Sequence, residues 1–375
     1  LSDKYRPLSH FFRQNFSQVT NPPIDSLREN EVMSLKTRFG NLGNILDFEN
    51  LTKENIYVLE SPVLSNSQFE KFTKFFDKNI RVIDCTFDIN KSLRERLNEL
   101  RLEAETAVRE GGKHLILTDK DVNEKKAPIP MVLAIGAINS RLIDLGIRGF
   151  ASINVQTGEV LDTHSFAVLL GVGATTINPY IAFDSIHHRY EKKLFGKLNF
   201  EECVHRYIKS VDNGLLKIMS KMGISVLSSY RGGCNFEAVG LSRALVADYF
   251  PGMISRISGI GISGIEKKIL KLHEKAFQKN ITILPIGGIY KYRKNGETHQ
   301  YQGNLIHLLQ HAVGKGSYEL YKKYAQNIYD LSPINPRDLI DFRKRYIKES
   351  IDISEVEPIE EILKRFGSGS MSHGA

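Results

Sequence analysis

Three glycines in the stretch GIGISG, Gly259, Gly261 and Gly264, have the spacing G-x-G-x-x-G. This spacing can place backbone N–H groups around a pyrophosphate where a strand joins a helix. Here it follows SRIS, which reads as a strand, and precedes the helical pattern IEKKILKLHEKAF. A dinucleotide site also needs an acidic residue after the next strand, but ITILP runs on to Gly287 and Gly288. We therefore expect a tight strand-to-helix turn here.

Histidine and cysteine side chains offer two further kinds of chemistry. His307 and His311 lie four residues apart in HLLQH, so a helix would present both imidazoles on one face, where they could bind zinc. No glutamate lies between them and no third ligand is evident, so we expect an ordinary helix surface and no metal site. Cys234 in SYRGGCNFEA would suit a nucleophile after a strand, but the sequence assigns it no histidine partner. A structural cysteine is favoured.

Arg231, in the same loop, is the stronger candidate for a functional contact. A guanidinium beside Gly232 and Gly233 can bind an anion or hold a neighbouring loop through paired hydrogen bonds. In the stretch GVGATTINPY, Asn178 precedes Pro179, which predicts a turn in which the asparagine side chain caps the following helix.

Composition narrows the class of protein. The chain has 375 residues, which favours one large domain with attached segments, or two domains. The net charge is +8, but the basic residues are scattered among acidic ones, which argues against a nucleic-acid-binding surface. No apolar run is long enough to span a membrane, and no secretory signal is evident. Three cysteines are too few for a disulfide framework, so we expect a cytoplasmic protein.

Strand and helix patterns alternate from about residue 56, which predicts an α/β fold with a parallel sheet. Eight strand-like segments between residues 56 and 262 favour an irregular (βα)8 TIM-barrel-like domain over an open sheet. The predicted strands include IYVLESPVL, IRVIDCTFD, KHLILTD, FASINVQTG, ATTIN, ISVLSS and SRISGIGI, with a short helix at GCNFEAVG. The alternation ends near residue 285, where Asn295-Gly296 predicts a hairpin turn and helices follow. We expect a helical and linker segment over 1–48, the barrel-like domain with C-terminal helices over 49–345, and a linker from 346 to 375.

Several longer stretches together resemble the central region of the large subunit of glutamate synthase, in order and spacing. They are QVTNPPIDSLRENEVMSL, LAIGAINSRLIDLG, GVGATTINPYIAFDSI, KIMSKMGISVLSSYRGGCNFEAVGLS and EVEPIEEILKRFGSGSMSHGA, and the resemblance covers essentially the whole chain. In that family an N-terminal glutaminase domain releases ammonia from glutamine. An FMN-binding barrel then converts ammonia and 2-oxoglutarate to 2-iminoglutarate, which the reduced flavin reduces to L-glutamate. The resemblance implies a central domain that connects the two and lines part of an ammonia tunnel.

The resemblance also assigns roles to individual residues. Thr20 and Asn21 match the pair near the tunnel entrance, although their composition suits helix capping equally well. Met371 and Ser372 lie in MSHGA, which matches the start of the FMN-binding domain, so 346–375 would be a linker and that domain's first residues. Ala375 stands where the family usually has serine.

What this chain lacks sets the remaining expectations. Residue 1 is leucine rather than a catalytic cysteine, and the three cysteines are far apart, so no iron–sulfur site is expected. We expect no catalytic residue and no cofactor in this chain alone, and no activity on its own, with FMN and an iron–sulfur cluster in the full-length subunit. The expected partners are the glutaminase and FMN domains of the same polypeptide, and a small electron-transfer subunit or ferredoxin.

Two other functions stay open. The first is a stand-alone barrel enzyme that binds a phosphate or a flavin at the carboxyl ends of its strands, near Arg231 and residues 171–174. The second is a nucleic-acid-binding protein, which rests on net charge alone.

Overall fold

The computed structural model describes residues 6–16, 26–40, 46, 56–233, 235–278, 286–289, 291–343 and 351–366. The chain divides into a larger compact unit that contains Arg6–Phe277 and a smaller one that contains Gln278–Ser372. Among the described residues no helix is long and apolar enough to cross a membrane.

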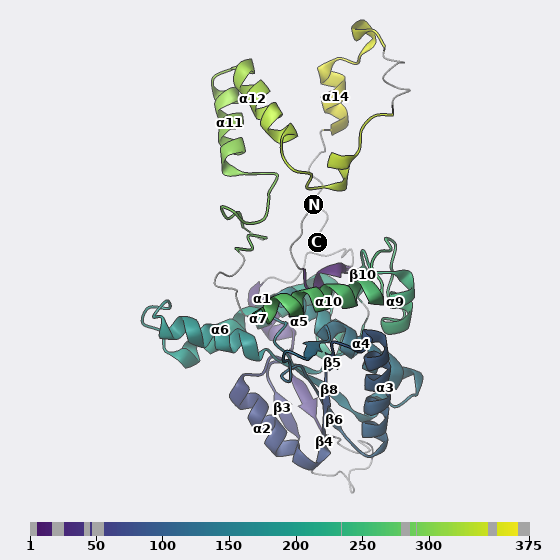
Figure 1. Cartoon of the computed structure of the whole chain (residues 1–375). Helices are drawn as coiled ribbons and strands as arrows, with labels where there is room; N and C mark the ends of the chain where they lie inside the picture. The colour runs from purple at the N-terminus through teal and green to yellow at the C-terminus, as the bar shows by residue number, and fades with distance from the viewer. Residues whose placement is uncertain are drawn as a thin grey trace. The chain divides into compact units, whose positions relative to one another are not determined.

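A four-stranded parallel sheet organises the larger unit (Figure 1). Its strands are β4 (Ile80–Asp84), β6 (His114–Thr118), β8 (Ser152–Gln156) and β9 (Thr176–Asn178), hydrogen-bonded in that order. All five residues of β6 are buried, as expected for a central parallel strand covered on both faces. The carboxyl ends of the four strands therefore lie at one edge of the sheet and their amino ends at the other.

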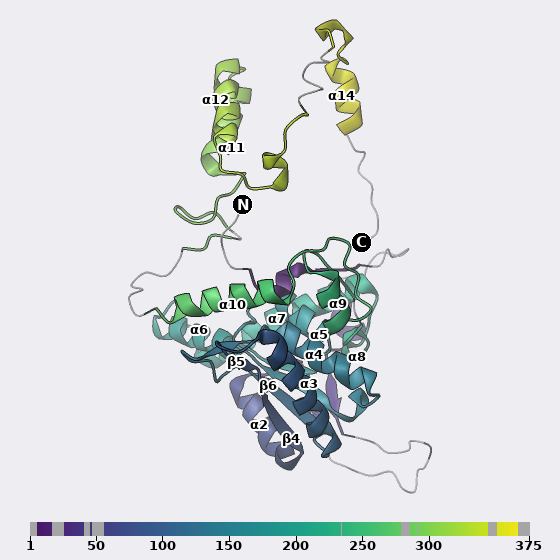
Figure 2. The ribbon, with the colours of Figure 1, turned by 45° about the vertical axis from the view of Figure 1, so that its right-hand side comes forward.

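The two faces of β6 pack into different apolar clusters, because successive side chains of a strand point to opposite faces. Leu115 and Leu117 belong to the main core, together with the buried side of α3 (Leu93–Arg109) and most of α4 (Met131–Asp144). Ile116 belongs to a smaller cluster with two phenylalanines of α2 (Asn66–Phe76). Figure 2 shows α2 and α3 from a second direction.

The helices that connect and cover these strands follow the local sequence signals. Helix α2 begins with a capping box, in which Ser65 Oγ accepts from Gln68 N and Gln68 Oε1 accepts from Ser65 N. The other helices of the larger unit are α1 (Ser26–Val32), α5 (Thr163–Gly171), α6 (Tyr180–Glu191), α7 (Phe200–Met222), α8 (Leu227–Tyr230), α9 (Arg243–Tyr249) and α10 (Ile262–Ala276), with 3-10 turns η1 (Leu8–Phe11), η2 (Asp77–Asn79) and η3 (Arg148–Phe150).

Three two-stranded antiparallel sheets complete the described part of the larger unit. They pair β1 (Phe12–Gln14) with β10 (Phe236–Ala238), β2 (Thr37–Phe39) with β3 (Tyr57–Leu59), and β5 (Thr86–Asp88) with β7 (Lys126–Pro128). The first of these pairings brings the N-terminal segment against a strand more than two hundred residues later in the chain. Phe12 and Phe236 from its two strands are both fully buried in the core.

The smaller unit is helical in its described part. Helices α11 (Gly303–Gly314) and α12 (Tyr318–Tyr329) pack against each other, and the remaining elements are η4 (Pro336–Leu339), η5 (Ile353–Glu355) and α14 (Ile359–Phe366). Asn295 adopts a positive φ of 62°, and Gly296 N donates to Arg293 O across 2.9 Å. The predicted turn is therefore present, but the described residues on either side of it do not form strands.

The predicted α/β class is confirmed, whereas an eight-stranded barrel is not found among the described residues. Val63 precedes β4 in the chain, yet its parallel bridge is to Ile177 of β9. A regular (βα)8 barrel would instead place the preceding strand beside β4. The described N-terminal segment is also mixed rather than helical, because it contributes β1 and β2 as well as η1 and α1.

Three local predictions were wrong. The last three residues of ISVLSS lie in helix α8 (Leu227–Tyr230) rather than in a strand, with Leu227 and Tyr230 buried three residues apart on one face. Residues 236–238 form strand β10 rather than a helix, since Phe236 and Ala238 alternate into the core. SRISGIGI forms no strand, and its one isolated bridge joins Ile260 to Leu241.

Candidate functional site

The residues singled out in the sequence divide into those that the structure describes and those that it does not. Arg231 is described and lines a cavity. The residues outside the described ranges are Thr20, Asn21, Cys234, Met371 and Ser372. The tunnel and flavin assignments therefore remain predictions, and Arg231 is the predicted site residue whose surroundings can be analysed.

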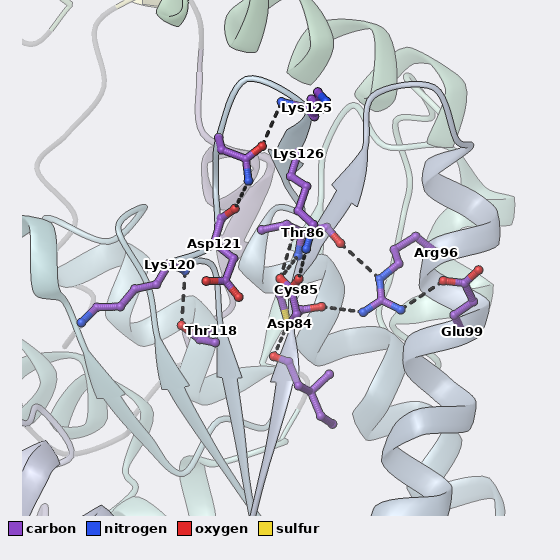
Figure 3. Close-up of polar contacts among 12 residues, drawn as sticks. Asp84, Cys85, Thr86, Arg96, Glu99, Thr118, Lys120, Asp121, Lys125 and Lys126 are labelled. Carbon is purple, nitrogen blue, oxygen red and sulfur yellow. Dashed lines mark hydrogen bonds and ion pairs between the residues drawn. The ribbon is translucent and has the colours of Figure 1, made fainter.

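The carboxyl edge of the parallel sheet is where α/β proteins usually bind ligands, and here it carries Asp84 at the end of β4. Asp84 Oδ1 accepts from Thr86 N (2.9 Å) and Thr86 Oγ1 (2.7 Å), and Oδ2 pairs with Lys126 Nζ at 3.0 Å (Figure 3). Burial opposes ionisation, but these hydrogen bonds and the ion pair outweigh it, so the pKa of Asp84 falls below its ordinary value. Arg96 Nη2 holds the same loop by donating to Asp84 O at 2.7 Å.

Asp119 follows β6 at this edge and is hydrogen-bonded on both oxygens. Oδ2 accepts from Thr157 Oγ1 at 2.5 Å, and Oδ1 accepts from Tyr180 Oη at 2.9 Å. Gly158 N lies 3.1 Å from each of the two oxygens. Burial raises the pKa of Asp119 despite these bonds. The group therefore joins the ends of β6 and β8 to helix α6.

Glu159 lies two residues after Thr157 in the chain, and its carboxyl group contacts the N-terminus of helix α4. Its Oε2 accepts from Met131 N at 2.9 Å. Burial raises the pKa of the Glu159 carboxyl to about 7, although the Met131 amide favours the charged form. Asp84, Asp119 and Glu159 thus each have partners within the chain, and their arrangement is that of a structural network.

The amino-terminal edge of the same sheet has a different character. A cavity of about 590 Å³ lies there, lined by residues that precede or begin the four strands, among them Asn79, Lys113, Ser152 and Thr175. Its remaining described walls come from β2, the end of α2 and its 3-10 turn, η3 and the loop after α8. The alternative phosphate or flavin site was expected at the carboxyl ends of the strands, near Arg231. The structure places Arg231 at the opposite, amino-terminal edge of the sheet.

Arg231 spans from this loop to the sheet. Its Nη2 donates to Thr37 Oγ1 at 3.1 Å and to Thr175 O at 3.4 Å. Its Nε is buried and has no hydrogen-bond partner within the described part of the chain. Burial, with a smaller contribution from the nearby Arg148 charge, lowers the pKa of Arg231 to about 10. The side chain is thus still a cation at neutral pH.

Arg148, a second half-buried arginine, lines the same cavity. Its three nitrogens donate to neutral oxygens: Asn139 Oδ1 at 2.6 Å, Ala151 O at 2.6 Å and Gly173 O at 2.8 Å. Burial lowers the pKa of Arg148 to about 10. The sequence analysis missed Arg148, because a single arginine between two glycines, in the connection from a helix to a strand, reads as a surface residue until the tertiary fold is known.

His114 forms part of the cavity wall at the start of β6. Its ring lies 4.0 Å from the Phe76 ring, centroid to centroid, and its Nδ1 lies 2.8 Å from Ser152 Oγ. Burial, together with the neighbouring Lys113 charge, lowers the pKa of His114 to about 4. The imidazole is therefore neutral at physiological pH and contributes hydrogen bonding rather than charge.

The other motifs have structural roles where they are described. Gly261 is the N-cap of α10, and a Cβ on Gly259 would lie 2.0 Å from the backbone oxygen of Gly240, so these glycines allow a close turn. His307 and His311 lie on α11. Among the described residues no group of three or more histidine, cysteine, aspartate or glutamate side chains could hold a metal ion.

Comparison with known proteins places this fold in a family. A family model described as the glutamate synthase central domain matches residues 1–242, and one described as a conserved region in glutamate synthase matches residues 299–375. The chain is 53% identical over 378 residues to the glutamate synthase (NADPH) large chain of Azospirillum brasilense, which covers 100% of this chain and 25% of that protein. It is 37% identical over 380 residues to the corresponding large chain of Bacillus subtilis, covering 100% and 24%.

A ferredoxin-dependent glutamate synthase of Pyropia yezoensis is also similar, with 37% identity over 390 residues that cover 100% of this chain and 25% of that protein. The chain spans about a quarter of the length of the curated relatives it matches. Because the central-domain model covers well over half of its residues, the chain belongs to the glutamate synthase family, and it corresponds to the region that contains the central domain.

Proposed function

We propose that this chain acts as the central region of a glutamate synthase large chain, where it connects a glutaminase domain to an FMN-binding domain and lines part of an ammonia passage. One observation carries the proposal. Two glutamate synthase models match in succession along the chain, the central domain first and the conserved region after it. The parallel order of β4, β6, β8 and β9 supports the further proposal that the domain is an irregular relative of the flavin-binding barrel.

The proposed reaction of the whole protein is the conversion of L-glutamine and 2-oxoglutarate to two molecules of L-glutamate. The partners within the polypeptide would be the glutaminase and FMN domains. The electron donor would be a small pyridine-nucleotide subunit or ferredoxin, in keeping with the names of the two kinds of relative. FMN and an iron–sulfur cluster would belong to the whole protein. Met371 and Ser372, which the resemblance places near the flavin, lie outside the described residues.

The passage has a physical reason. Ammonia that reaches water is protonated or lost, and an ammonium ion cannot attack the carbonyl carbon of 2-oxoglutarate. A passage lined by neutral hydroxyl and amide groups keeps ammonia solvated without binding it as a charged group would. Thr20 and Asn21 have such side chains, which supports their proposed place at the entrance.

The decisive experiment blocks the passage in the intact protein. The variants Thr20→Trp and Asn21→Trp are compared with Leu102→Trp, which adds the same bulk at an exposed position of α3. We expect glutamine-dependent glutamate formation to fall at least about tenfold while glutamine hydrolysis continues and ammonia appears in solution. Glutamate formation from added ammonia should be retained.

Equal coupling of glutamine hydrolysis to glutamate synthesis in all three variants would refute the assignment of Thr20 and Asn21 to the passage.

The alternative of a stand-alone enzyme is tested separately, by titrating the 375-residue chain with FMN. Saturable binding would support that alternative. The hydrogen-bonded carboxyl edge of the sheet, where Asp84 and Asp119 are already engaged, leads us to expect none.

A further inference from the structure

The cavity at the amino-terminal edge of the sheet is cationic. Four of its lining residues carry positive charge, namely Arg38, Lys113, Arg148 and Arg231, and no aspartate or glutamate is among the described residues that line it. At the carboxyl edge, in contrast, Asp84 forms an ion pair with Lys126. The two edges of one sheet thus differ in how their charges are compensated.

Arg148 and Arg231 are half-buried, so the lack of a counter-charge among the described residues of the cavity wall is costly. A buried charge without a partner of opposite sign destabilises a protein by several kcal/mol. The contacts of Arg148 and Arg231 are all to neutral oxygens within the described part of the chain. Within the described part of the chain, Arg231 makes these contacts through Nη2, and its buried Nε has no hydrogen-bond partner there. An anion in the cavity would compensate both guanidinium groups.

The shape and lining of the cavity indicate more than a lone ion. Its volume of about 590 Å³ falls within the range of small-molecule sites. Phe39, Phe76 and Phe150 form apolar parts of the wall, beside the neutral imidazole of His114. A molecule with one strongly anionic end and a small organic body would match both parts of this lining.

We propose that this cavity binds a small molecule through an oxyanion group, a carboxylate or a phosphate, which Arg231 and Arg148 contact from the buried side and Arg38 and Lys113 from the solvent side. Guanidinium groups suit either oxyanion, because their planar N–H donors match pairs of oxygens. The proposal is independent of the ammonia passage and concerns a different set of residues.

The test is calorimetric titration of the 375-residue chain with succinate and, separately, with inorganic phosphate, at low ionic strength. We expect saturable binding of at least one probe near one site per chain, and the stronger of the two identifies the oxyanion. Binding should weaken as salt is added, since surface charges contribute to it. Saturable binding of neither probe would overturn the proposal.

Variants locate the binding. Arg38→Gln and Lys113→Gln remove charge at exposed positions, and each should weaken binding several-fold, with the double variant about tenfold or more weaker. Lys209→Gln, at an exposed position of α7 away from the cavity lining, is the matched control and should bind as the unmodified chain does. Equal affinity of the double variant and the control would place the ligand elsewhere and refute the assignment.

Arg231→Met keeps a side chain of similar length without the charge. We expect it to lose binding of the preferred probe and also the rise in unfolding temperature that the probe produces. Retention of that rise in Arg231→Met would contradict the role of the buried guanidinium. If Arg231→Met does not fold, the Arg38 and Lys113 variants decide the question alone, because both positions are exposed.

Discussion

Tyr180 donates its hydroxyl hydrogen to Asp119 Oδ1 across 2.9 Å, and this bond connects the first residue of α6 to the residue that follows β6. Strand β8 lies between β6 and β9, so the bond spans the sheet edge rather than joining neighbouring strands. Thr157, at the end of β8, donates to the other oxygen of the same carboxylate. Asp119 therefore connects three elements that are far apart in sequence.

We predict that Tyr180→Phe and Thr157→Val each destabilise the fold by about 1–2 kcal/mol, because each removes a hydrogen bond to a buried carboxylate. The two losses should not add, since both donors serve Asp119, and a double-mutant cycle in urea unfolding measures the coupling. Tyr190→Phe, on the more exposed part of the same helix, is the control. Additive effects of the two substitutions would show that the donors act independently.

Glu159 predicts a pH dependence of stability. Its pKa is about 7 in the folded chain, raised mainly by burial, whereas the unfolded value is near 4.5. Between these values the folded chain keeps a proton that the unfolded chain has lost. The free energy of unfolding should therefore fall as pH rises from about 4.5 to about 7, and this contribution levels off above that.

The variant Glu159→Gln isolates this contribution, because its side chain is neutral throughout while its carbonyl oxygen can still accept from Met131 N. Its stability relative to the unmodified chain should increase by roughly 2 kcal/mol between the two ends of that pH window. Denaturant unfolding across the window measures the difference, and the exposed Glu110→Gln variant controls for loss of a carboxylate in general. A constant difference between Glu159→Gln and the unmodified chain would show that Glu159 ionises normally.

Most helices could be predicted from the sequence, because caps and apolar spacing are local properties. Ser65 and Gln68 provide the whole capping box of α2 within four residues. In α3, the buried Leu93, Leu97 and Leu100 recur at helical spacing. In the smaller unit, helices α11 and α12 agree with the prediction that helices follow the turn at Asn295-Gly296.

The short elements after α7 could not be predicted, because their structure depends on distant partners. The stretch from Ile224 to Ser229 is apolar enough for a strand, but its described residues make only one bridge, between Val226 and Ser34. Phe236 lies in a strand because β1, which is more than two hundred residues earlier in the sequence, supplies the hydrogen bonds. A single sequence contains no signal for either pairing.

The cavity was predictable only in part. Arg231 stood out beside two glycines, but the sequence did not indicate which edge of the sheet its loop approaches. Arg148 and His114 become cavity residues only when the strands assemble, since Arg148 lies in the turn η3 before β8 and His114 is the first residue of the buried strand β6. Charge compensation depends on the tertiary fold, so only the structure shows that no described aspartate or glutamate lines the cavity beside these arginines.

Asn178 gives a third prediction, and it also corrects the expected role of this residue. The N-cap of α6 is Pro179, with no capping hydrogen bond from a side chain. Asn178 instead donates from Nδ2 to Leu64 O at 3.0 Å and to Asn66 Oδ1 at 2.9 Å, and accepts from Gln156 Nε2 at 3.2 Å. It thus connects β9 to the segment before α2.

We predict that Asn178→Ala lowers the free energy of unfolding by about 2–3 kcal/mol, because the side chain is fully buried and its partners lose their hydrogen bonds. Asn66→Ala removes only one of these bonds, at an exposed position, and should cost less than about 1 kcal/mol. Urea unfolding compares the two variants. Equal effects would mean that Asn178 matters only through Asn66.

The G-x-G-x-x-G stretch supplies the last prediction. A Cβ on Gly259 would lie 2.0 Å from Gly240 O, a backbone atom that also accepts from Ile260 N at 2.9 Å. Backbone cannot give way as a flexible side chain does, so the two segments would have to separate and that hydrogen bond would break. Gly259→Ala should therefore destabilise the chain by about 2–4 kcal/mol.

Gly261→Ala is the matched control within the same stretch, since a Cβ there would lie 3.4 Å from Ser242 Oγ, an ordinary contact. Its cost should stay below about 1 kcal/mol, as expected for a change at an N-cap. Thermal or urea unfolding measures both variants, and NADPH titration accompanies it. A dinucleotide site would give the opposite result: Gly259→Ala would keep its stability and lose saturable NADPH binding, because the glycine would then serve the approach of a pyrophosphate rather than of Gly240.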